Sequence, residues 1–156
     1  MADIEKTSPS SKQEERLALL LWFRLSRFYN QSLRRSNAHL KEWGLTVTQF
    51  DVLVQIGAHE PLTQNELAEK LFVTKGNVTQ VLGKMEQLGW IRREQEWRKK
   101  VLTLTSSGRE IFREVVPHQE QFQASQFQGL CKEEQKQLLE LLRKLQHHNE
   151  DMEGKR

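Results

Sequence analysis

The sequence predicts a mainly helical fold that carries one small β-hairpin, and three observations support this expectation. Apolar residues recur at helical spacing through most of the chain. Only three prolines and eight glycines are available for turns, which is too few for an all-β fold. Residues 90–104 are the stretch with strand character. The length of 156 residues suits a single domain.

A long helix is expected over residues 12–43, because neither Pro nor Gly interrupts this segment. Apolar residues recur there at the spacing of a helix face, namely Leu17, Leu20, Leu21, Leu25 and Phe28. Residues 1–11 are polar and aperiodic, and we expect them to be disordered. Gly44 is expected to end the helix, since glycine readily adopts the left-handed conformation found after many helices.

Two shorter helices follow, and each is expected to begin at a capping box. In this motif a hydroxyl and an acidic side chain three residues later bind backbone N–H groups that the helix leaves unsatisfied. Thr48 and Asp51 supply the first box, and Glu60-Pro61 closes that helix. Thr63 and Glu66 supply the second box.

A third short helix is expected over residues 74–88, with Thr74 as its cap and Gly89 as its end. Its core face occupies positions i, i+3, i+4 and i+7, which are Val78, Val81, Leu82 and Met85. A hairpin then follows, with strands 90–93 and 100–104 and a polar tip at 94–98. In its second strand Leu102 and Leu104 alternate with Val101 and Thr103, which predicts one buried face.

Two further helices complete the chain. Thr105 or Ser106 is expected to cap the first, in which Pro117 marks either a kink or an early turn. The pattern breaks near Gly129, and residues 132–150 form a last helix. The leucines of that helix are Leu138, Leu139, Leu141, Leu142 and Leu145.

The order of a short helix, a tight connection, a second helix and a two-stranded ribbon is typical of a winged helix-turn-helix. In that fold the second helix enters a DNA major groove, and the ribbon, called the wing, reaches the neighbouring backbone or minor groove. The helix over 74–88 presents polar side chains away from its core face, and such side chains bind base edges or phosphates. The candidate DNA-binding residues on it are Thr74, Lys75, Gly76, Asn77, Thr79, Gln80 and Lys84.

The distribution of charge supports the same surface. Residues 70–100 hold eight cations and three anions, a net charge of +5, whereas the other residues sum to −2 within a total of +3. Cationic side chains neutralise DNA phosphates and so add affinity without sequence preference. We therefore expect double-stranded DNA as a partner, with Arg92, Lys99 and Lys100 at phosphates.

Four sequence blocks follow one another through the predicted helices and hairpin: Gly44–Leu53, Leu62–Ala68, Val78–Ile91 and Leu104–Gly108. Together they resemble the MarR family of bacterial transcription regulators. No single block is specific, but the four occur in order at the family's spacing, and the similarity covers about residues 12–150. The resemblance implies a homodimer with interlocking first and last helices, a pseudo-palindromic operator, and repression that a small ligand or oxidation relieves.

The wing departs from the family pattern. Members commonly carry Asp-Arg-Arg there, whereas nine residues before Thr105 this chain has Glu96-Trp97-Arg98, so Trp97 replaces the first arginine. The tip is also about three residues shorter than in the family. The resemblance implies that Arg98 enters the minor groove and that Glu96 orients it. Trp97 either packs on sugar or backbone, or covers the ribbon.

The terminal helices carry more leucines than a compact middle region can cover. We expect residues 12–43 and 115–150 to form a core shared by two chains, next to a DNA-binding lobe at 44–114. The alternative is an intramolecular helix pair. The family's use of phenolic ligands implies a small aromatic effector, whose pocket candidates are Trp22, His39 and Trp43; such residues are also common in cores.

Other classes of site are disfavoured. The chain has no Gly-rich phosphate loop, nucleophile elbow or HExxH motif, so neither an enzyme nor a cofactor is expected. Cys131 alone cannot form a multi-cysteine zinc site, so no metal is expected. Oxidation-sensing members of the family generally carry their cysteine early in the first helix, so the resemblance implies an inert thiol at Cys131 and not a redox sensor. The apolar run Leu17–Phe23 is too short to span a membrane, and a cytoplasmic protein is expected.

Two functions remain. The preferred one is a sequence-specific DNA-binding transcriptional regulator that acts as a repressor. The alternative is a winged-helix protein-interaction module, which uses the basic lobe on an acidic protein and binds no specific DNA sequence. Selection from a random DNA pool separates them, because only the first enriches a palindrome.

Overall fold

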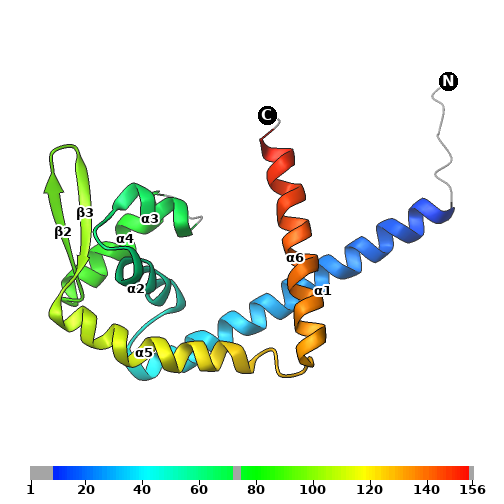
Figure 1. Ribbon diagram of the computed structural model, residues 1–156, viewed down its shortest axis with the longest axis horizontal. Helices are drawn as coiled ribbons and strands as arrows, with labels where there is room; N and C mark the ends of the chain where they lie inside the picture. Colours follow the sequence, from blue (N-terminus) through cyan, green and yellow to red (C-terminus); the bar gives the residue numbers. More distant parts are fainter. Residues whose placement is uncertain (1–8, 72–74, 155–156) are drawn as a thin grey trace. The chain divides into compact units, whose positions relative to one another are not determined.

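The computed structural model describes residues 9–71 and 75–154 and confirms a mainly helical winged helix-turn-helix fold (Figure 1). The chain divides after Val115 into two compact units, and the boundary falls within the fifth α-helix. The elements in order are α1 (Pro9–Leu40), η1 (Lys41–Trp43), α2 (Val47–His59), β1 (Leu62–Thr63), α3 (Gln64–Leu71), α4 (Lys75–Gln87), β2 (Ile91–Glu96), β3 (Lys99–Leu104), α5 (Ser106–Ser125) and α6 (Lys132–Glu153).

The first helix begins earlier than expected. α1 starts at Pro9, so the last three positions of the segment 1–11 are helical, and residues 1–8 lie outside the described part of the chain. A single 3₁₀ turn, η1, follows α1, and Gly44 ends it in the left-handed conformation with φ = 69°, as expected for this glycine. In the described ranges, no helix combines the length and the hydropathy that crossing a membrane requires.

The cap of α2 differs from the prediction. Thr46 and Gln49 form the capping box, and not Thr48 and Asp51: Gln49 N donates to Thr46 Oγ1 at 3.2 Å, and Thr46 N donates to Gln49 Oε1 at 3.0 Å. Because the chain turns at Gly44, Thr46 is the residue that precedes α2, and Thr48 already lies in the first turn of that helix. Asp51 is half-buried one turn further on, and burial raises the pKa of its carboxyl.

The predicted capping box of α3 is confirmed. Thr63 N donates to Glu66 Oε2 at 2.8 Å, and Glu66 N donates to Thr63 Oγ1 at 3.2 Å. The pKa of the exposed Glu66 carboxyl lies below its ordinary value. The main cause is the hydrogen bond from the Thr63 backbone N–H, and the second is the hydrogen bond with the Thr63 hydroxyl. The positive charges of Lys99 and Lys70 act in the same direction.

The sheet has three strands, whereas the sequence predicts a two-stranded hairpin. β1 pairs with β3 through Leu62↔Leu102 and Thr63↔Val101, which gives the order β1-β3-β2 with both pairings antiparallel. A strand of two residues is too short to show any alternation of apolar and polar positions. Only the pairing with β3 identifies it.

The hairpin tip is also shorter than expected. The ladder between β2 and β3 extends to the pair Glu96↔Lys99, so the polar tip is not 94–98 but the two residues Trp97-Arg98. Residues 94–96 are Glu-Gln-Glu, and such polar residues have little intrinsic preference for strands. Their pairing with β3 supplies the backbone hydrogen bonds, and tertiary context overrides that preference.

The core of the first unit lies between α2, α4, the sheet and the start of α5. Its fully buried side chains come from all of these elements and include Val52, Leu53, Ile56, Leu67, Val78, Leu82, Met85, Leu102 and Val115. On β3 the buried positions Leu102 and Leu104 alternate with half-buried ones, as the sequence predicts. The core therefore holds α4 and the sheet in a fixed relation.

A close contact joins the base of the wing to α5. Thr105, rather than Ser106, caps the helix: Gly108 N donates to Thr105 Oγ1 at 3.0 Å, and Thr105 N donates to Trp90 O at 3.1 Å. Gly108 lies so near the wing that a Cβ atom there would be 1.9 Å from Trp90 O. Only glycine fits this position without moving the backbone.

The second unit contains the end of α5 and α6. The helix α5 continues through Pro117 to Ser125, so the early turn considered for this proline does not form. Cys131 is the exposed N-cap residue of α6, and its N–H donates to Glu134 Oε2 at 2.8 Å. The last helix ends at Glu153, three residues beyond the predicted end.

Replacing Gly108 with alanine is expected to lower the free energy of unfolding by about 1–3 kcal/mol, because the added methyl group forces Trp90 O to move. Gly83→Ala is the matched control, since nothing lies within 4 Å of a Cβ at this helical glycine. The control is expected to be neutral or stabilising by up to about 1 kcal/mol. Thermal unfolding followed by circular dichroism checks both, and equal midpoints for the two variants would contradict the expectation.

Candidate nucleic-acid interface

The orientation of α4 follows from the burial of one of its faces. Val78, Leu82 and Met85 have exposed fractions of 1% or less, so this face is fixed against the core. Successive residues of an α-helix are about 100° apart around its axis. The stripe opposite the buried face therefore consists of Gly76, Gln80, Gly83 and Gln87.

Two of these four outward positions are glycines, so the helix carries no side chain at these points. Neither Gly76 nor Gly83 has any atom within 4 Å of where a Cβ would lie, so neither glycine is required by packing within the chain. A helix without side chains at these points can bring its backbone close to a partner. Gln80 and Gln87 lie on the same stripe, and an amide of this kind can bind an adenine edge bidentately. Gln87 was not among the residues selected from the sequence.

Most of the candidates on α4 are exposed as predicted. The exposed ones are Gly76, Asn77, Thr79, Gln80 and Lys84. Thr74 lies outside the described residues, and so does the side chain of Lys75, whose backbone begins α4. Asn77 and Gln80 border a groove of about 230 Å³ between α4 and the start of α2, which Thr48 also lines.

The hydroxyl of Thr79 already takes part in the fold. Gln64, the first residue of α3, donates from Nε2 to Thr79 Oγ1 at 2.8 Å, which links the two helices of the helix-turn-helix. Thr79 is exposed, and it carries a methyl group besides this hydroxyl. A methyl group at this position is suited to apolar contact with a thymine methyl.

An ion pair joins α4 to the wing. Arg93 on β2 donates from Nε and Nη2 to the same Glu86 oxygen, Oε2, at 2.8 and 2.6 Å. The exposed fractions of the two side chains are 22% and 40%, so solvent screens the pair only in part. The pair fixes the angle between the outward stripe and the hairpin. Neither residue was a sequence candidate, because a spacing of seven residues across a helix end carries no recognisable signal.

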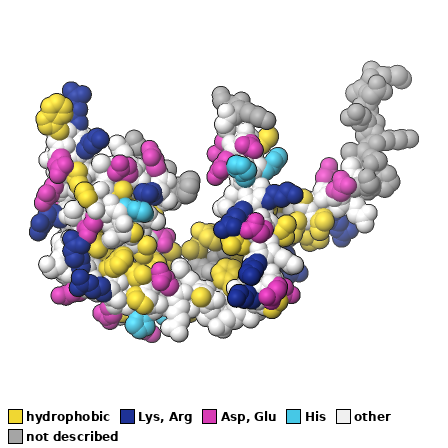
Figure 2. All heavy atoms as spheres, in the orientation of Figure 1, with side chains coloured by type: hydrophobic (Ala, Val, Ile, Leu, Met, Phe, Trp, Pro, Cys, Tyr) yellow, Lys and Arg dark blue, Asp and Glu magenta, His cyan; other side chains and the backbone are white. Residues whose placement is uncertain are grey.

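The cations of the wing lie near its tip. Arg98, Lys99 and Lys100 line one side of a groove of about 450 Å³, and the start of α3 lines the other. Figure 2 shows cationic and hydrophobic side chains next to each other at the hairpin tip. Arg92 lies further down the ribbon, 3.8 Å from Glu94, and the two side chains of this pair are 65% and 60% exposed. These positions leave the four cations accessible to an anionic partner.

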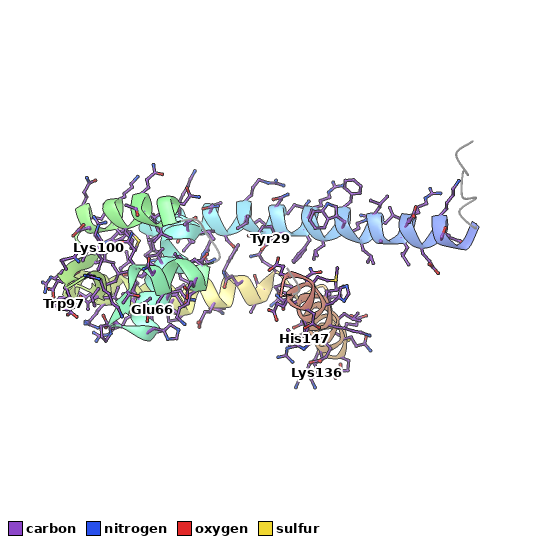
Figure 3. All side chains as sticks on the ribbon, turned by 90° about the horizontal axis from the view of Figure 1, so that it is seen from above. Tyr29, Glu66, Trp97, Lys100, Lys136 and His147 are labelled. Atoms are coloured by element: carbon purple, nitrogen blue, oxygen red, sulfur yellow. The ribbon has the colours of Figure 1, made fainter. Side chains whose placement is uncertain are left out.

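The expected contact from Glu96 to Arg98 is not formed. Within the described ranges, no hydrogen bond or ion pair joins these two side chains, and in the ladder Glu96 lies opposite Lys99. The turn between them is held by Gln95, whose Nε2 donates to Trp97 O at 2.8 Å. Trp97 is 94% exposed, so it does not cover the ribbon, and Figure 3 shows it at the outer edge of the first unit.

The three candidates for an effector pocket do not come together within one chain. The rings of His39 and Trp43 lie 5.2 Å apart, and Trp43 Nε1 donates to Glu114 Oε1 at 2.9 Å. Trp22 lies 17 positions before His39 on α1, which is about 25 Å along the helix axis. His39 and Trp43 are thus a local aromatic pair beside α5, and Trp22 is a separate exposed residue.

The chain is similar to known transcription regulators. The sequence profile of the MarR family matches residues 43–96. A helix-turn-helix-type transcriptional regulator of Bacillus cereus is 44% identical over 142 residues, which cover 90% of this chain and 97% of the relative. The structure of BpsR from Bordetella bronchiseptica, a protein whose DNA binding is regulated by 6-hydroxynicotinic acid, is 25% identical with a TM-score of 0.76 and covers 81% of this chain and 98% of BpsR.

A structure with bound DNA shares the fold. In the complex of Staphylococcus aureus MepR with DNA, the MepR chain is 24% identical to this chain with a TM-score of 0.75. The match covers 81% of this chain and 95% of MepR. At this identity the comparison concerns the fold alone.

The pair Arg93–Glu86 is expected to contribute about 0.5–1 kcal/mol to stability in a double-mutant cycle of alanine substitutions, because it is close and partly shielded from water. The pair Arg92–Glu94 is the matched control on the same strand, and its coupling energy is expected to be near zero because both side chains are well exposed. Urea unfolding at one protein concentration measures both cycles. Equal coupling energies would mean that the Arg93 pair does not brace the wing.

Proposed function

The chain belongs to the MarR family of transcriptional regulators, and from this premise we propose that it is a homodimeric repressor that binds a pseudo-palindromic operator in double-stranded DNA. The family consists of transcriptional regulators and not of enzymes. The observation that carries the proposal is the outward stripe of α4, which lies beside a wing in a segment with a net charge of +5. The proposal places the protein in the cytoplasm, where its DNA is.

Each part of this surface has its own role in the proposed complex. The stripe of α4 enters the major groove, where Gln80 and its neighbour Asn77 bind base edges. Lys84 and the wing cations Arg92, Lys99 and Lys100 bind phosphates, which positions the protein without reading sequence. Arg98, at the tip, enters the adjacent minor groove. The MepR–DNA complex, which has the same fold, supports the use of this lobe for DNA.

The apolar surface of α1 supports the homodimer. The run from Leu17 to Phe23 is apolar at seven consecutive positions, nearly two turns, so apolar side chains surround the whole helix. The large side chains of this run are 53–66% exposed, and Tyr29 one to two turns later is 60% exposed (Figures 2 and 3). One neighbouring helix cannot cover every side of such a segment. A second copy that wraps around it can.

The helix α6 offers a second apolar face. Leu138, Leu141, Leu142 and Leu145 lie at positions i, i+3, i+4 and i+7, and none of them is fully buried. The opposite side is polar and carries the pairs Arg143–Glu140 and His147–Glu150. The contrast between the two sides is typical of a helix that packs against a partner. Two copies joined here would set two reading helices about one DNA turn apart.

The proposal includes release from DNA by a small aromatic ligand. The support is the relative BpsR, whose DNA binding is regulated by 6-hydroxynicotinic acid, together with the aromatic pair of His39 and Trp43. A planar ligand can stack on such rings, and Glu114, which already accepts a hydrogen bond from Trp43, lies beside them. The pair connects the end of α1 with α5, so a ligand there would bias how the lobe is held.

Selection from a random DNA pool tests the DNA-binding proposal. We expect an enriched palindrome whose half-sites are about 10 base pairs apart, the spacing of a two-fold dimer. Gln80→Ala is expected to weaken binding to the selected operator by about 1–3 kcal/mol and to relax the preference at one base pair of each half-site. Gln121→Ala, an exposed glutamine on α5, is the control and is expected to bind as well as the wild type.

Several outcomes would contradict this proposal. A pool that returns no palindrome would favour a protein-interaction module that uses the basic lobe on an acidic partner. An affinity that does not fall as salt concentration rises would exclude phosphate contacts as a main source of binding. Equal losses for Gln80→Ala and the control variant would mean that α4 does not read bases.

Light scattering after gel filtration tests the dimer. The wild type is expected at twice the mass of one chain, and Leu141→Glu is expected to shift it to the monomer because a carboxylate cannot be buried in an apolar interface. His147→Glu adds the same group to the polar side of α6 and is expected to remain dimeric. Circular dichroism confirms that both variants keep their helices. A monomeric wild type, or dissociation of both variants alike, would overturn the assignment of this face.

A further inference from the structure

Trp97 is displayed at the tip of the wing without any structural reason. It is 94% exposed, more than any other large apolar side chain in the described residues. No hydrogen bond holds its indole within those residues, and the contact in which it takes part, from Gln95 Nε2, uses only its backbone oxygen. A tryptophan in such a position gains nothing from folding, because its apolar surface stays in water.

The backbone at Trp97 is unfavourable for a tryptophan. Its φ is 58°, and among the described residues it is the one non-glycine residue in the left-handed region. It occupies the first position of a two-residue hairpin loop, closed by the pair Glu96↔Lys99. Positive φ at the first position alone is the pattern of a type II′ turn, which strongly favours glycine there. Strained residues of this kind persist mainly where function requires the side chain.

The surroundings of Trp97 indicate what its ring meets. Arg98, Lys99 and Lys100 follow it directly, so a polyanion drawn to these cations brings its backbone up to the indole. The indole carries no charge that could form an ion pair with phosphate, and its N–H can donate only one hydrogen bond. Its apolar faces pack well on the deoxyribose rings that form the walls of a minor groove. We propose that Trp97 is the wing's apolar DNA contact and packs against the deoxyribose wall of the minor groove beside the α4 site; this inference rests on the proposed DNA binding.

Sugar packing fits the tip better than insertion between bases. Glu96 precedes Trp97 directly, and its backbone pairs with Lys99 at the last step of the ladder, so its carboxylate belongs to the tip of the wing. The floor of a minor groove has a strongly negative potential, most of all where the groove is narrow. A carboxylate next to the ring opposes deep entry. The indole therefore stays at the rim of the groove, while Arg98 on its other side reaches inward.

This contact has a thermodynamic signature. A cation that neutralises one phosphate charge, from the backbone or from within a groove, releases counterions and adds about 0.9 to the magnitude of the slope of log affinity against log salt concentration. An indole on a sugar displaces no counterion, so it adds affinity but no slope. Trp97 and Arg98, neighbours in one turn, should therefore differ in the salt dependence that each controls.

Trp97→Gly is the decisive variant, because glycine removes the ring and also suits the left-handed turn. We expect its thermal midpoint to equal or exceed that of the wild type, and its affinity for the operator selected by the wild type to fall at least about tenfold with an unchanged salt slope. Trp97→Phe, which keeps an aromatic ring, is expected to retain most of the affinity. Arg98→Ala is the matched control and is expected to lower the slope.

Hydroxyl-radical footprinting locates the contact, since the radicals attack deoxyribose hydrogens in the minor groove. The wild type is expected to protect sugars at the flanks of each half-site, and Trp97→Gly is expected to lose that protection at protein concentrations that saturate the operator. If Trp97→Gly binds and protects as the wild type does, or if its salt slope falls as for Arg98→Ala, the inference is wrong. If the wild type selects no operator, the proposed function fails instead.

Discussion

The burial of one face of α4 is the constraint on which the rest of this protein depends. Val78, Leu82 and Met85 are removed from water almost completely, and each contributes about 2 kcal/mol through that burial. A helix has a fixed period, so the burial of this face decides which residues point outward. The outward stripe of α4 is therefore a consequence of core packing. The hydrogen bond from Gln64 to Thr79 adds a link between α3 and α4.

The wing depends on the same core through its base. Ile91, Leu102 and Leu104 bury the lower part of the ribbon, and Gly108 lets α5 pack directly against Trp90. Above that base the strands are mostly exposed, and the ion pair between Arg93 and Glu86 ties them to α4. The lobe thus combines a helix fixed by the core with a ribbon anchored at one end. The tip can present a strained and exposed residue because no core packing depends on it.

Sequence reasoning predicted the candidate site well where a helical period was involved and less well at turns. The exposed positions Asn77, Gln80 and Lys84 followed from the spacing of the core residues on α4. The cap of α2 was placed at Thr48 because its spacing to Asp51 fits a capping box, but Thr46 and Gln49 fit one equally well. The geometry of the Gly44 turn decides between them. The two-residue strand β1 and the pair of Arg93 with Glu86 leave no local pattern at all.

The sequence by itself determined the order of the α-helices and the hairpin, the faces of the helices, the glycine stops and the concentration of positive charge, because these depend on local period and composition. Only the tertiary structure decided the length of the wing and the exposure of Trp97. The propensity of residues 94–96 disfavours a strand, but pairing with β3 supplies their backbone hydrogen bonds. This pairing leaves only two residues for the turn. A left-handed tryptophan results from that closure, and no rule of local sequence would place one there.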